Sequence, residues 1–540
     1  MIRVVHEDDD VLAVDKPEGV PCQAADPSHR DDLPFRLQRE RGLDYLGIHQ
    51  RLDKDTSGVV VYAKRKAANP GLAEQMEGRR VEKRYVAVVT GWKGGPRRLE
   101  HHLARGKDGN TVLASARDAR AKRAITHVER VERVGDRALL ELRIETGRTH
   151  QIRAQLAAEG APVCGDPVYG GEAAPRLMLH ASQMRLRHPV SGAPLTIEAP
   201  TPRLLGAWLR GAHDPFAPDA LADAIERAFE RRWGLAHRED VTAFRALNAD
   251  GDGLPGVAID RYDAWLVLHL YDDGVPHEAA ILEALERRGD ARGVYVKRRP
   301  KQANVVVEAG EEHAPAQPVL GAPAPSPLSI VESGTPFLVR LGEGLSTGLF
   351  LDQRLNRERV RELAGGQRVL NLFAYTCGFT VAAGLGGARE TLSVDASAPA
   401  LEQGRENLEH AGLPLDRHRL ERGDCFEVLR ELRAREERFG LVILDPPTYS
   451  TTKTTRWNSG KSWRGLARLA LDVLEPGGRL LACSNDRRMS QGAFRRYVRD
   501  AAADRSIALA QLKDLAPPPD FPGEDQPKGL LVTREPAQRR

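Results

Sequence analysis

From about residue 345 onward, short apolar runs alternate with segments of helical patterning, and this alternation constrains the fold more than any other feature of the sequence. The apolar runs lie at 368–374, 391–395, 441–447 and 479–483. Strands that alternate with helices are typical of a doubly wound parallel sheet, because each crossover helix packs on one face of that sheet. We therefore expect an α/β Rossmann-like domain over residues 341–540.

The first 205 residues follow a different pattern, in which short β-like runs are separated by turn residues and helical patterns are few. The runs lie at 11–17, 58–64, 84–90 and 138–146. This spacing predicts a mixed α+β domain with a mostly antiparallel sheet over residues 1–205. Prolines between 189 and 202 mark its end, and residues 206–234 have the pattern of a helical linker.

Residues 235–340 carry further strand signals and a loop rich in proline and alanine at 313–327. The strand signals lie at 244–262, 265–271, 293–299, 304–310 and 336–341. This pattern predicts a small β-rich module. A multidomain chain is also what the length of 540 residues requires, since single hydrophobic cores stop growing at about 250–300 residues.

Several classes of protein are disfavoured by composition. The sequence has no apolar run of about 18 residues, and its acidic start lacks the basic region of a signal peptide, so we expect a cytoplasmic protein without a membrane span. The five cysteines lie far apart, which favours reduced thiols over a zinc site, and we expect no metal. They are Cys22, Cys164, Cys377, Cys425 and Cys483.

The formal net charge is only +4, but basic residues are clustered along the chain. Clusters occur at 64–66, 79–84, 97–98, 117–123 and 297–299. Local groups of this kind can follow a nucleic-acid backbone even when the whole chain is nearly neutral. Any one of them can equally be a solvated surface, and the sequence leaves both readings open.

The first candidate site combines two polar turns. Asp53 lies in a turn between apolar strands, and the segment 146–153 forms a second, basic turn that ends with Arg153 at the start of a helical pattern. If the two turns adjoin, this carboxylate and this guanidinium meet. Taken alone, the pattern also fits an Asp that caps a turn and an Arg that covers a helix.

These stretches resemble, in chain order, the RluA-type pseudouridine synthases. The matching pieces are 14–17, 51–58, 83–87, 146–153, 165–170 and 176–181. The resemblance implies that Asp53 is the nucleophile of uridine isomerisation and that Arg153 pairs with it. It also implies that Tyr85 stacks on the uracil and lies near the proton that leaves carbon-5. It implies no cofactor for this half of the chain, and it makes Arg51 and Arg148 candidate RNA contacts.

One position departs from this family. Gln50 stands where its members usually have a histidine directly before the Arg-Leu-Asp motif, and His49 lies one residue earlier. The nucleophile itself is unaffected. The departure bears on the packing of the catalytic loop and on target preference.

The second candidate site lies at the predicted carboxyl edge of the parallel sheet. Asp395 ends a strand about 20 positions after a turn that contains Gly378, an arrangement in which the acid binds ribose hydroxyls. Asp424 and Asp445 follow the next two strands, and Asp445 is followed by two prolines that stiffen its turn. By pattern alone, this is a Rossmann-like domain with an unspecified ligand.

The region 240–535 resembles class I methyltransferases of large-subunit ribosomal RNA, of the RlmI/RlmK type. The matching pieces are 248–250, 258–262, 347–354, 371–376, 384–388, 394–395 and 445–448. The resemblance implies S-adenosylmethionine as cofactor, ribosomal RNA as partner, a middle module that contacts RNA, and Asp445 as a catalytic residue. It places the cofactor against Phe350, Gln353, Arg354, Asn371, Phe373, Tyr375, Asp395 and Asp424.

We expect methylation of guanine nitrogen-7, because no cysteine adjoins the turn 445–447, and because the segment 484–488 and Thr448 resemble the guanine nitrogen-7 enzymes. An endocyclic nitrogen has a lone pair and needs only to be positioned. The alternative is carbon-5 of cytosine, which requires a cysteine to add to the ring; Cys483 is the candidate. Two further alternatives are an RNA chaperone or ribosome-assembly factor with one inactive half, and a methyltransferase for proteins or small molecules.

Overall fold

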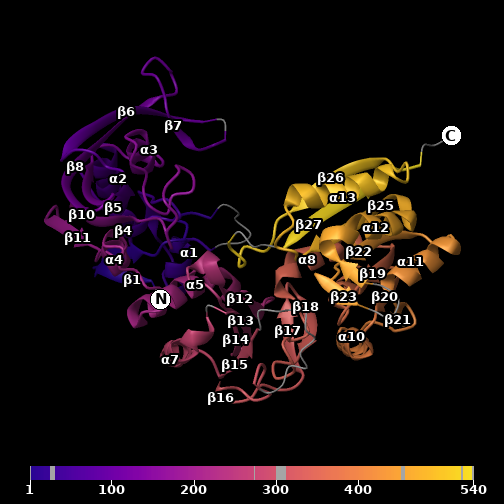
Figure 1. Ribbon diagram of the computed structural model, residues 1–540. Helices are drawn as coiled ribbons and strands as arrows, with labels where there is room; N and C mark the ends of the chain where they lie inside the picture. Colours follow the sequence, from indigo (N-terminus) through magenta and orange to yellow (C-terminus); the bar gives the residue numbers. More distant parts are fainter. Residues whose placement is uncertain are drawn as a thin grey trace. The chain divides into compact units, whose positions relative to one another are not determined.

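A computed structural model describes residues 2–24, 31–106, 108–272, 274–299, 312–451, 456–523 and 527–537 (Figure 1). The predicted strand at 304–310 lies outside these residues. The chain forms two compact units, residues 1–234 and 235–540. The multidomain fold class is confirmed, whereas the predicted boundaries at 205, 234 and 340 stay a prediction.

The first unit is built on an eleven-stranded sheet with the order β1-β2-β4-β10-β5-β9-β8-β6-β7, to which β3 and β11 are added at β4 and β10. Its strands are β1 Arg3–Glu7, β2 Val11–Lys16, β3 Gly47–Ile48, β4 Ser57–Ala63, β5 Glu82–Thr90, β6 Arg97–Arg105, β7 Thr111–Leu113, β8 Lys122–Val134, β9 Arg137–Ile144, β10 Leu179–Arg187 and β11 Pro194–Glu198. Neighbours pair antiparallel except β4 and β10, which are parallel. The predicted mixed, mostly antiparallel sheet is therefore confirmed.

Short helices join these strands. They are α1 Leu33–Arg41, the 3-10 helix Lys66–Ala68, α2 Asn69–Glu77, α3 Gln151–Ala158, α4 Arg203–Leu209 and α5 Pro218–Arg231, with α6 Trp233–Ala236 at the boundary. Helix α5, in the predicted linker, packs within the first unit because buried Glu18 pairs with Arg176 and with Arg227 of this helix. Residues 206–234 are thus part of the first compact unit.

The second unit begins with a five-stranded sheet of order β12-β13-β14-β15-β16. Its elements are β12 Ala243–Asn248, the 3-10 helix Ala249–Asp252, β13 Val257–Tyr262, β14 Trp265–Leu270, the 3-10 helix Val275–His277, α7 Glu278–Arg288, β15 Gly293–Arg298 and β16 Leu320–Gly321, followed by the hairpin β17 Leu328–Glu332 and β18 Thr335–Val339. This is the β-rich module predicted from the sequence.

The remainder is a seven-stranded sheet of order β21-β20-β19-β22-β25-β27-β26. Its strands are β19 Arg368–Leu372, β20 Glu390–Asp395, β21 His418–Arg422, β22 Phe439–Leu444, β25 Leu474–Ser484, β26 Leu509–Leu515 and β27 Lys528–Arg534, and a separate hairpin pairs β23 Tyr449–Thr451 with β24 Arg456–Asn458. The strands up to β25 are parallel and β27 is antiparallel. The strand order reverses between β19 and β22, and ligands bind at such a switch point.

Helices cover both faces of this sheet. They are the 3-10 helix Leu351–Gln353, α8 Arg354–Leu363, α9 Gly378–Leu385, α10 Ala398–His410, α11 Cys425–Ala434, α12 Ser459–Asp472 and α13 Gln491–Ala503. Leu370 and Leu372 of β19 belong to a core that includes α11, α12 and α13, whereas Val369 belongs to a core with α8 and α9. This alternation is the period of two expected of a strand buried on both sides.

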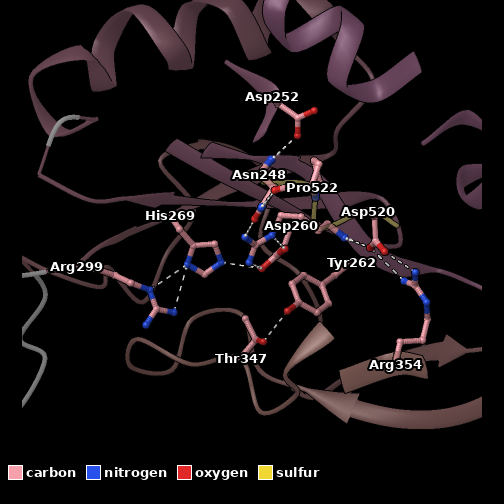
Figure 2. A network of polar contacts seen from close by, with 11 residues as sticks. Asn248, Asp252, Asp260, Tyr262, His269, Arg299, Thr347, Arg354, Asp520 and Pro522 are labelled. Carbon is pink, nitrogen blue, oxygen red and sulfur yellow. Dashed lines mark hydrogen bonds and ion pairs between the residues drawn. The ribbon is translucent and has the colours of Figure 1, made fainter. Parts of the chain in front are cut away.

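Figure 2 shows a buried polar network that joins the β-rich module to the seven-stranded sheet domain within the second unit. Asp260 accepts hydrogen bonds from Arg245 and His269. Asp520, in the segment between β26 and β27, accepts from the Arg245 backbone N–H and from the Arg354 side chain. The β26–β27 connection is therefore fixed to the module through Arg245 and to the start of α8 through Arg354.

Two candidate active sites

The first site is a large cavity in the first unit, with a volume of about 1080 Å³. Asp53 lies in its wall, in the loop between β3 and β4, and its backbone carbonyl accepts from Thr56 N–H to close the turn at 3.1 Å. The carboxylate is about one quarter exposed, with 24% of the side-chain surface accessible. It is therefore reachable by a molecule in the cavity.

Arg153 of α3 meets this carboxylate, as the paired turns predict. Its Nη1 donates to Asp53 Oδ2 over 3.3 Å. Its Nε and Nη2 donate to Asp166 over 2.6 and 2.9 Å. Burial alone would lower the pKa of Arg153, but the hydrogen bonds and charge of Asp166 outweigh it and hold that pKa above its usual value. The guanidinium is thus a fixed positive charge beside Asp53.

Tyr85 of β5 also lines the cavity and is largely buried. Burial, and then the charge of Asp53, raise the pKa of Tyr85 well above its usual value. The phenol therefore stays protonated at neutral pH and offers a ring face with a hydroxyl at its edge.

The two candidate RNA contacts, Arg51 and Arg148, lie at the same cavity. Arg51 is exposed and donates to Gln23 Oε1 over 3.2 Å, while Arg148 donates to the Arg123 carbonyl over 3.2 Å. Gln50, the residue that departs from the family pattern, is buried and its amide approaches the Val59 carbonyl at 3.4 Å. It thus contacts β4 rather than the nucleophile.

The second site is a cavity of about 280 Å³ at the switch point of the parallel sheet. Seven residues singled out from the sequence line it: Phe350, Gln353, Phe373, Tyr375, Asp395, Asp424 and Asp445. They come from the segment before α8 and from the carboxyl ends of four strands. The strand-end pattern therefore does bring these residues together.

Asp395 is held by two backbone N–H groups. Its Oδ2 accepts from Tyr375 and its Oδ1 from Ser397, each over 2.8 Å. Tyr375 has a backbone φ of +49°, and its neighbours Phe373 and Cys377 are also left-handed at +59° and +63°. Three such residues in one turn are unusual and are a mark of functional sites. Here the conformation aims the Tyr375 N–H at the carboxylate.

Two predicted cofactor contacts, Arg354 and Asn371, do not line this cavity. Arg354 is 2% exposed and donates to both oxygens of Asp520, at 3.1 and 2.5 Å (Figure 2). Asn371 is 1% exposed and donates to Thr380 Oγ1 over 2.9 Å. Both side chains make these hydrogen bonds inside the protein, so they lie behind the cavity wall.

The polar wall of the cavity contains atoms suited to a ligand. Gln353 and Asp445 line it, and Gln353 Nε2 and Asp445 Oδ1 are buried and have no hydrogen-bond partner among the described residues. A buried polar atom without a partner costs about 1–3 kcal/mol, so such atoms in a cavity mark contacts that a bound molecule completes. Burial, and then the charge of Asp352, raise the pKa of Asp445 to about 7.

Cys483 lies on β25 and does not line the cavity. It is fully buried in the core with Leu481 and Ile443, and its Sγ is 3.5 Å from Asn356 Nδ2. Burial, followed by the charges of Asp445 and Asp352, raises the pKa of its thiol well above the usual value. Asn485, two residues on, does reach the cavity.

Sequence reasoning did not single out three residues of these sites. Asp166 lies in the matching piece 165–170 and holds Arg153 from behind the cavity; the need of a buried Arg153 for a counter-charge is the signal that could have found it. His150, 3.9 Å from Asp53 Oδ2, lies in the basic turn 146–153, and Asn485 follows the last apolar run; both line a cavity. Nothing in their spacing indicates which way their side chains point.

The described residues also place Asp8, Asp10 and His188 with ligand atoms within 4.8 Å of one another. Asp8 already accepts hydrogen bonds from its own turn, and Asp10 pairs with Arg65 at 2.8 Å. We assign no metal to this cluster. Among the helices of the described residues, none has both the length and the apolar character needed to cross a membrane.

Comparison with known proteins matches two family models to this chain. The family model for S-adenosylmethionine-dependent methyltransferases matches residues 258–533. The chain belongs to this family. A model for RNA pseudouridylate synthases matches residues 10–158, so the methyltransferase also carries a synthase domain in its first unit. The prediction of two enzyme domains in one chain, one of them using S-adenosylmethionine, is confirmed.

Two curated relatives are named ribosomal RNA large subunit methyltransferase I. The one from Erwinia tasmaniensis is 35% identical over 317 residues, 58% of this methyltransferase and 79% of the relative. The one from Klebsiella pneumoniae is 35% identical over 348 residues, 61% and 86% of the two chains. A solved structure from Streptococcus mutans, assigned as an S-adenosylmethionine-dependent methyltransferase, is 25% identical with a TM-score of 0.53, covering 65% of this chain and 87% of that one.

Proposed function

We propose that this chain is a bifunctional RNA-modification enzyme. Its first unit converts a uridine of RNA to pseudouridine, and its second unit transfers a methyl group to guanine nitrogen-7 of large-subunit ribosomal RNA. The names of the curated relatives support ribosomal RNA as the partner of the second unit.

For the synthase, the supporting observation is the shared guanidinium of Arg153, which binds Asp166 through two hydrogen bonds and Asp53 through a third. Asp166 is fully buried and fixes the arginine, so the arginine can pair with the Asp53 carboxylate and hold it aimed into the cavity. An ionised carboxylate is what attack on the target uridine requires, after which the glycosidic bond breaks and the base reattaches through carbon-5.

The target base must leave its stack to reach Asp53, as in other enzymes that act on bases. We assign Tyr85 to stacking on the uracil, because its ring lies in the cavity wall and stays uncharged. Exposed Arg51 and half-buried Arg148 are assigned to the phosphates that flank the flipped nucleotide.

For the methyltransferase, the supporting observation is Asp395, whose two oxygens are each oriented by a backbone N–H at the switch point. A carboxylate held in this way can accept from ribose hydroxyls of the cofactor. We assign Phe350, Phe373 and Tyr375 to the apolar walls, and Gln353 and Asp424 to polar contacts. S-adenosylmethionine supplies the electrophilic methyl group, and Arg354 and Asn371 hold the wall from behind.

The methylated atom is proposed from the surroundings of Asp445. The buried Oδ1 of Asp445 has no hydrogen-bond donor among the described residues, and the amino and imino groups of guanine can provide one. Carbon-5 chemistry would need a reactive thiol, but Cys483 is fully buried and its raised pKa disfavours the thiolate. A guanine nitrogen needs only to be oriented toward the methyl group.

Nucleoside mass spectrometry with position mapping tests both activities. Ribosomal and transfer RNA from cells without the protein should lack one pseudouridine and one 7-methylguanine that cells with it contain. Complementation with Asp53→Asn should restore only the methyl group, and complementation with Asp395→Ala should restore only pseudouridine. Appearance of 5-methylcytosine in place of 7-methylguanine would refute the guanine assignment.

A further inference from the structure

His150 lies beside the nucleophile in the first cavity. It precedes α3 with a left-handed backbone φ of +50°, and its side chain is 21% exposed. Its Nε2 is 3.9 Å from Asp53 Oδ2. A left-handed conformation is uncommon for a residue other than glycine, and here it turns the imidazole toward the cavity.

The hydrogen bonds of the imidazole define its tautomer. Nδ1 lies 3.1 Å from the Tyr169 hydroxyl, and this hydroxyl donates to the Thr111 carbonyl over 2.9 Å. A phenol has one hydrogen to donate, so Tyr169 must accept from His150, and Nδ1 carries the proton. In a neutral imidazole, Nε2 then has a lone pair, and this lone pair faces Asp53.

His150 is also the group suited to take a proton here. Burial, together with the nearby charge of Arg153, lowers the pKa of His150 against the opposing charges of Asp53, Asp166 and Asp55. The imidazole is therefore neutral near pH 7. Arg153 has no lone pair to offer, and the Tyr85 phenol is uncharged with a raised pKa.

We propose that His150 is a further catalytic residue of the synthase site, and that its Nε2 takes the proton released from carbon-5 of the target base. The proposal rests on the proposed function of this unit. Once the base has reattached, carbon-5 is bonded to the ribose and still holds its hydrogen. Nε2 accepts that hydrogen as a proton, and the C5–H electron pair becomes the C5=C6 double bond.

The remaining electrons and protons then balance without an oxidant or reductant. The C6=N1 electron pair moves onto N1, which takes up a proton from water, and the imidazolium returns its proton to water. The net change is a proton moved from carbon-5 to N1. General bases typically contribute a factor of 10²–10⁴ to a rate.

His150→Gly is the test variant, because glycine accepts the left-handed backbone and leaves room for added imidazole. The substrate is RNA from cells that lack the protein, labelled with tritium at carbon-5 of uracil. We expect tritium release by the full chain to fall about 100-fold and to recover in proportion to imidazole concentration. His213→Gln, a histidine of the same unit outside this cavity, is the control and should match the native chain. Near-native release by His150→Gly, or a loss that imidazole does not restore, would overturn the proposal.

A second measurement separates proton transfer from positioning of Asp53. RNA from such cells grown with 5-fluorouracil has fluorine in place of the carbon-5 hydrogen, so its covalent adduct with the enzyme reports only the earlier steps. His150→Gly should form this adduct within about threefold of the native rate, since the proton step is absent, and equal losses in both assays would refute the proton role. His150 sets the acid limb of the native pH profile, because a protonated imidazole cannot accept the carbon-5 proton. The titratable and charged groups around it are Asp53, Asp55, Arg153, Asp166 and Tyr169. The acid limb should therefore disappear in His150→Gly. If the native chain releases no tritium, the proposed function of the first unit is wrong. If the native chain releases tritium and His150→Gly releases it equally well, only the role of His150 is wrong.

Discussion

Arg354 donates two hydrogen bonds to Asp520, a residue 166 positions further along the chain, and both side chains are buried (Figure 2). Arg354 begins α8, directly after Gln353 of the cofactor cavity wall. The ion pair therefore connects the β26–β27 segment to the start of the helix that carries part of this wall. An ion pair outside the cavity therefore holds a helix that forms part of its wall.

We predict that Asp520→Ala destabilises the second unit by about 3–5 kcal/mol, because it leaves the Arg354 guanidinium buried without its counter-charge. Urea denaturation of the full chain measures the loss. Asp504→Ala, which removes the partner of Arg464 in a pair whose arginine is 52% exposed, is the matched control and should lower stability much less, because solvent screens exposed pairs. If the two variants lower the free energy of unfolding equally, the buried pair contributes no more to stability than the exposed pair.

Arg354 also shows where sequence reasoning stops. Alternation of apolar and helical segments predicts the parallel sheet, and strand ends predict that Asp395, Asp424 and Asp445 share an edge; these three do line one cavity. Arg354 occupies a matching motif position, but its direction depends on Asp520, a partner distant in sequence. Contacts of that kind arise from tertiary packing and cannot be predicted from the spacing of residues in the sequence.

The synthase site also has one part that the sequence predicts and another part that it does not. The two polar turns predict a meeting of Asp53 and Arg153, which the fold produces at 3.3 Å. The anchoring role of Asp166 depends on its two hydrogen bonds from Arg153, and the tautomer of His150 depends on the hydrogen bonds of Tyr169. Such bonds need the folded loops, because no local pattern encodes which side of a loop a side chain takes.

Asp53→Asn should abolish pseudouridine formation while methyl transfer and cofactor binding stay nearly intact. The amide cannot supply an anionic nucleophile, and the two cavities lie in separate compact units. Tritium release from carbon-5-labelled RNA is the readout. Substantial release by this variant would refute the role of Asp53.

Arg153→Ala should also impair the synthase severely, since both Asp53 and Asp166 would lose their partner. Asp166→Asn keeps the shape of the side chain and removes its charge, so a smaller loss is expected from it. Single-turnover kinetics on the same RNA would rank the two variants. Near-native turnover by Arg153→Ala would rule out the pairing as a functional contact.

Asp395→Ala should weaken binding of S-adenosylmethionine by about 1–3 kcal/mol, through loss of charged hydrogen bonds to the ribose. Titration calorimetry on the full chain measures this change. Asp290→Ala, on the surface of the β-rich module where it pairs with Arg261, is a suitable control and should leave affinity unchanged. An unaltered dissociation constant for Asp395→Ala would place the ribose elsewhere.

Asp445 gives a prediction with a defined pH window. Its folded-state pKa of about 7 is above the ordinary value near 4, so the folded chain binds a proton that the unfolded chain has released between these pH values. Stability therefore falls as pH rises through this window. Asp445→Asn removes the penalty, so it should become more stable relative to the native chain by roughly 1–3 kcal/mol between pH 4 and pH 8. Urea denaturation of both proteins at the two pH values, without cofactor, measures the difference, and a constant difference would show that Asp445 does not titrate in this range.

Cys483 decides between the two candidate methyl acceptors. Because its thiol, on β25, is fully buried and has a raised pKa, Cys483→Ala and Cys483→Ser should keep most of the methylation activity if the acceptor is a guanine nitrogen. A carbon-5 cytosine enzyme behaves otherwise, since its cysteine must add to the ring before the methyl group is transferred, and its variants lose activity or trap RNA. Mass spectrometry of the methylated nucleoside, combined with denaturing gels for a covalent complex, reads out both possibilities. Loss of methylation in both variants, with 5-methylcytosine as the native product, would make Cys483 the nucleophile and require its side chain to move toward the cavity during catalysis.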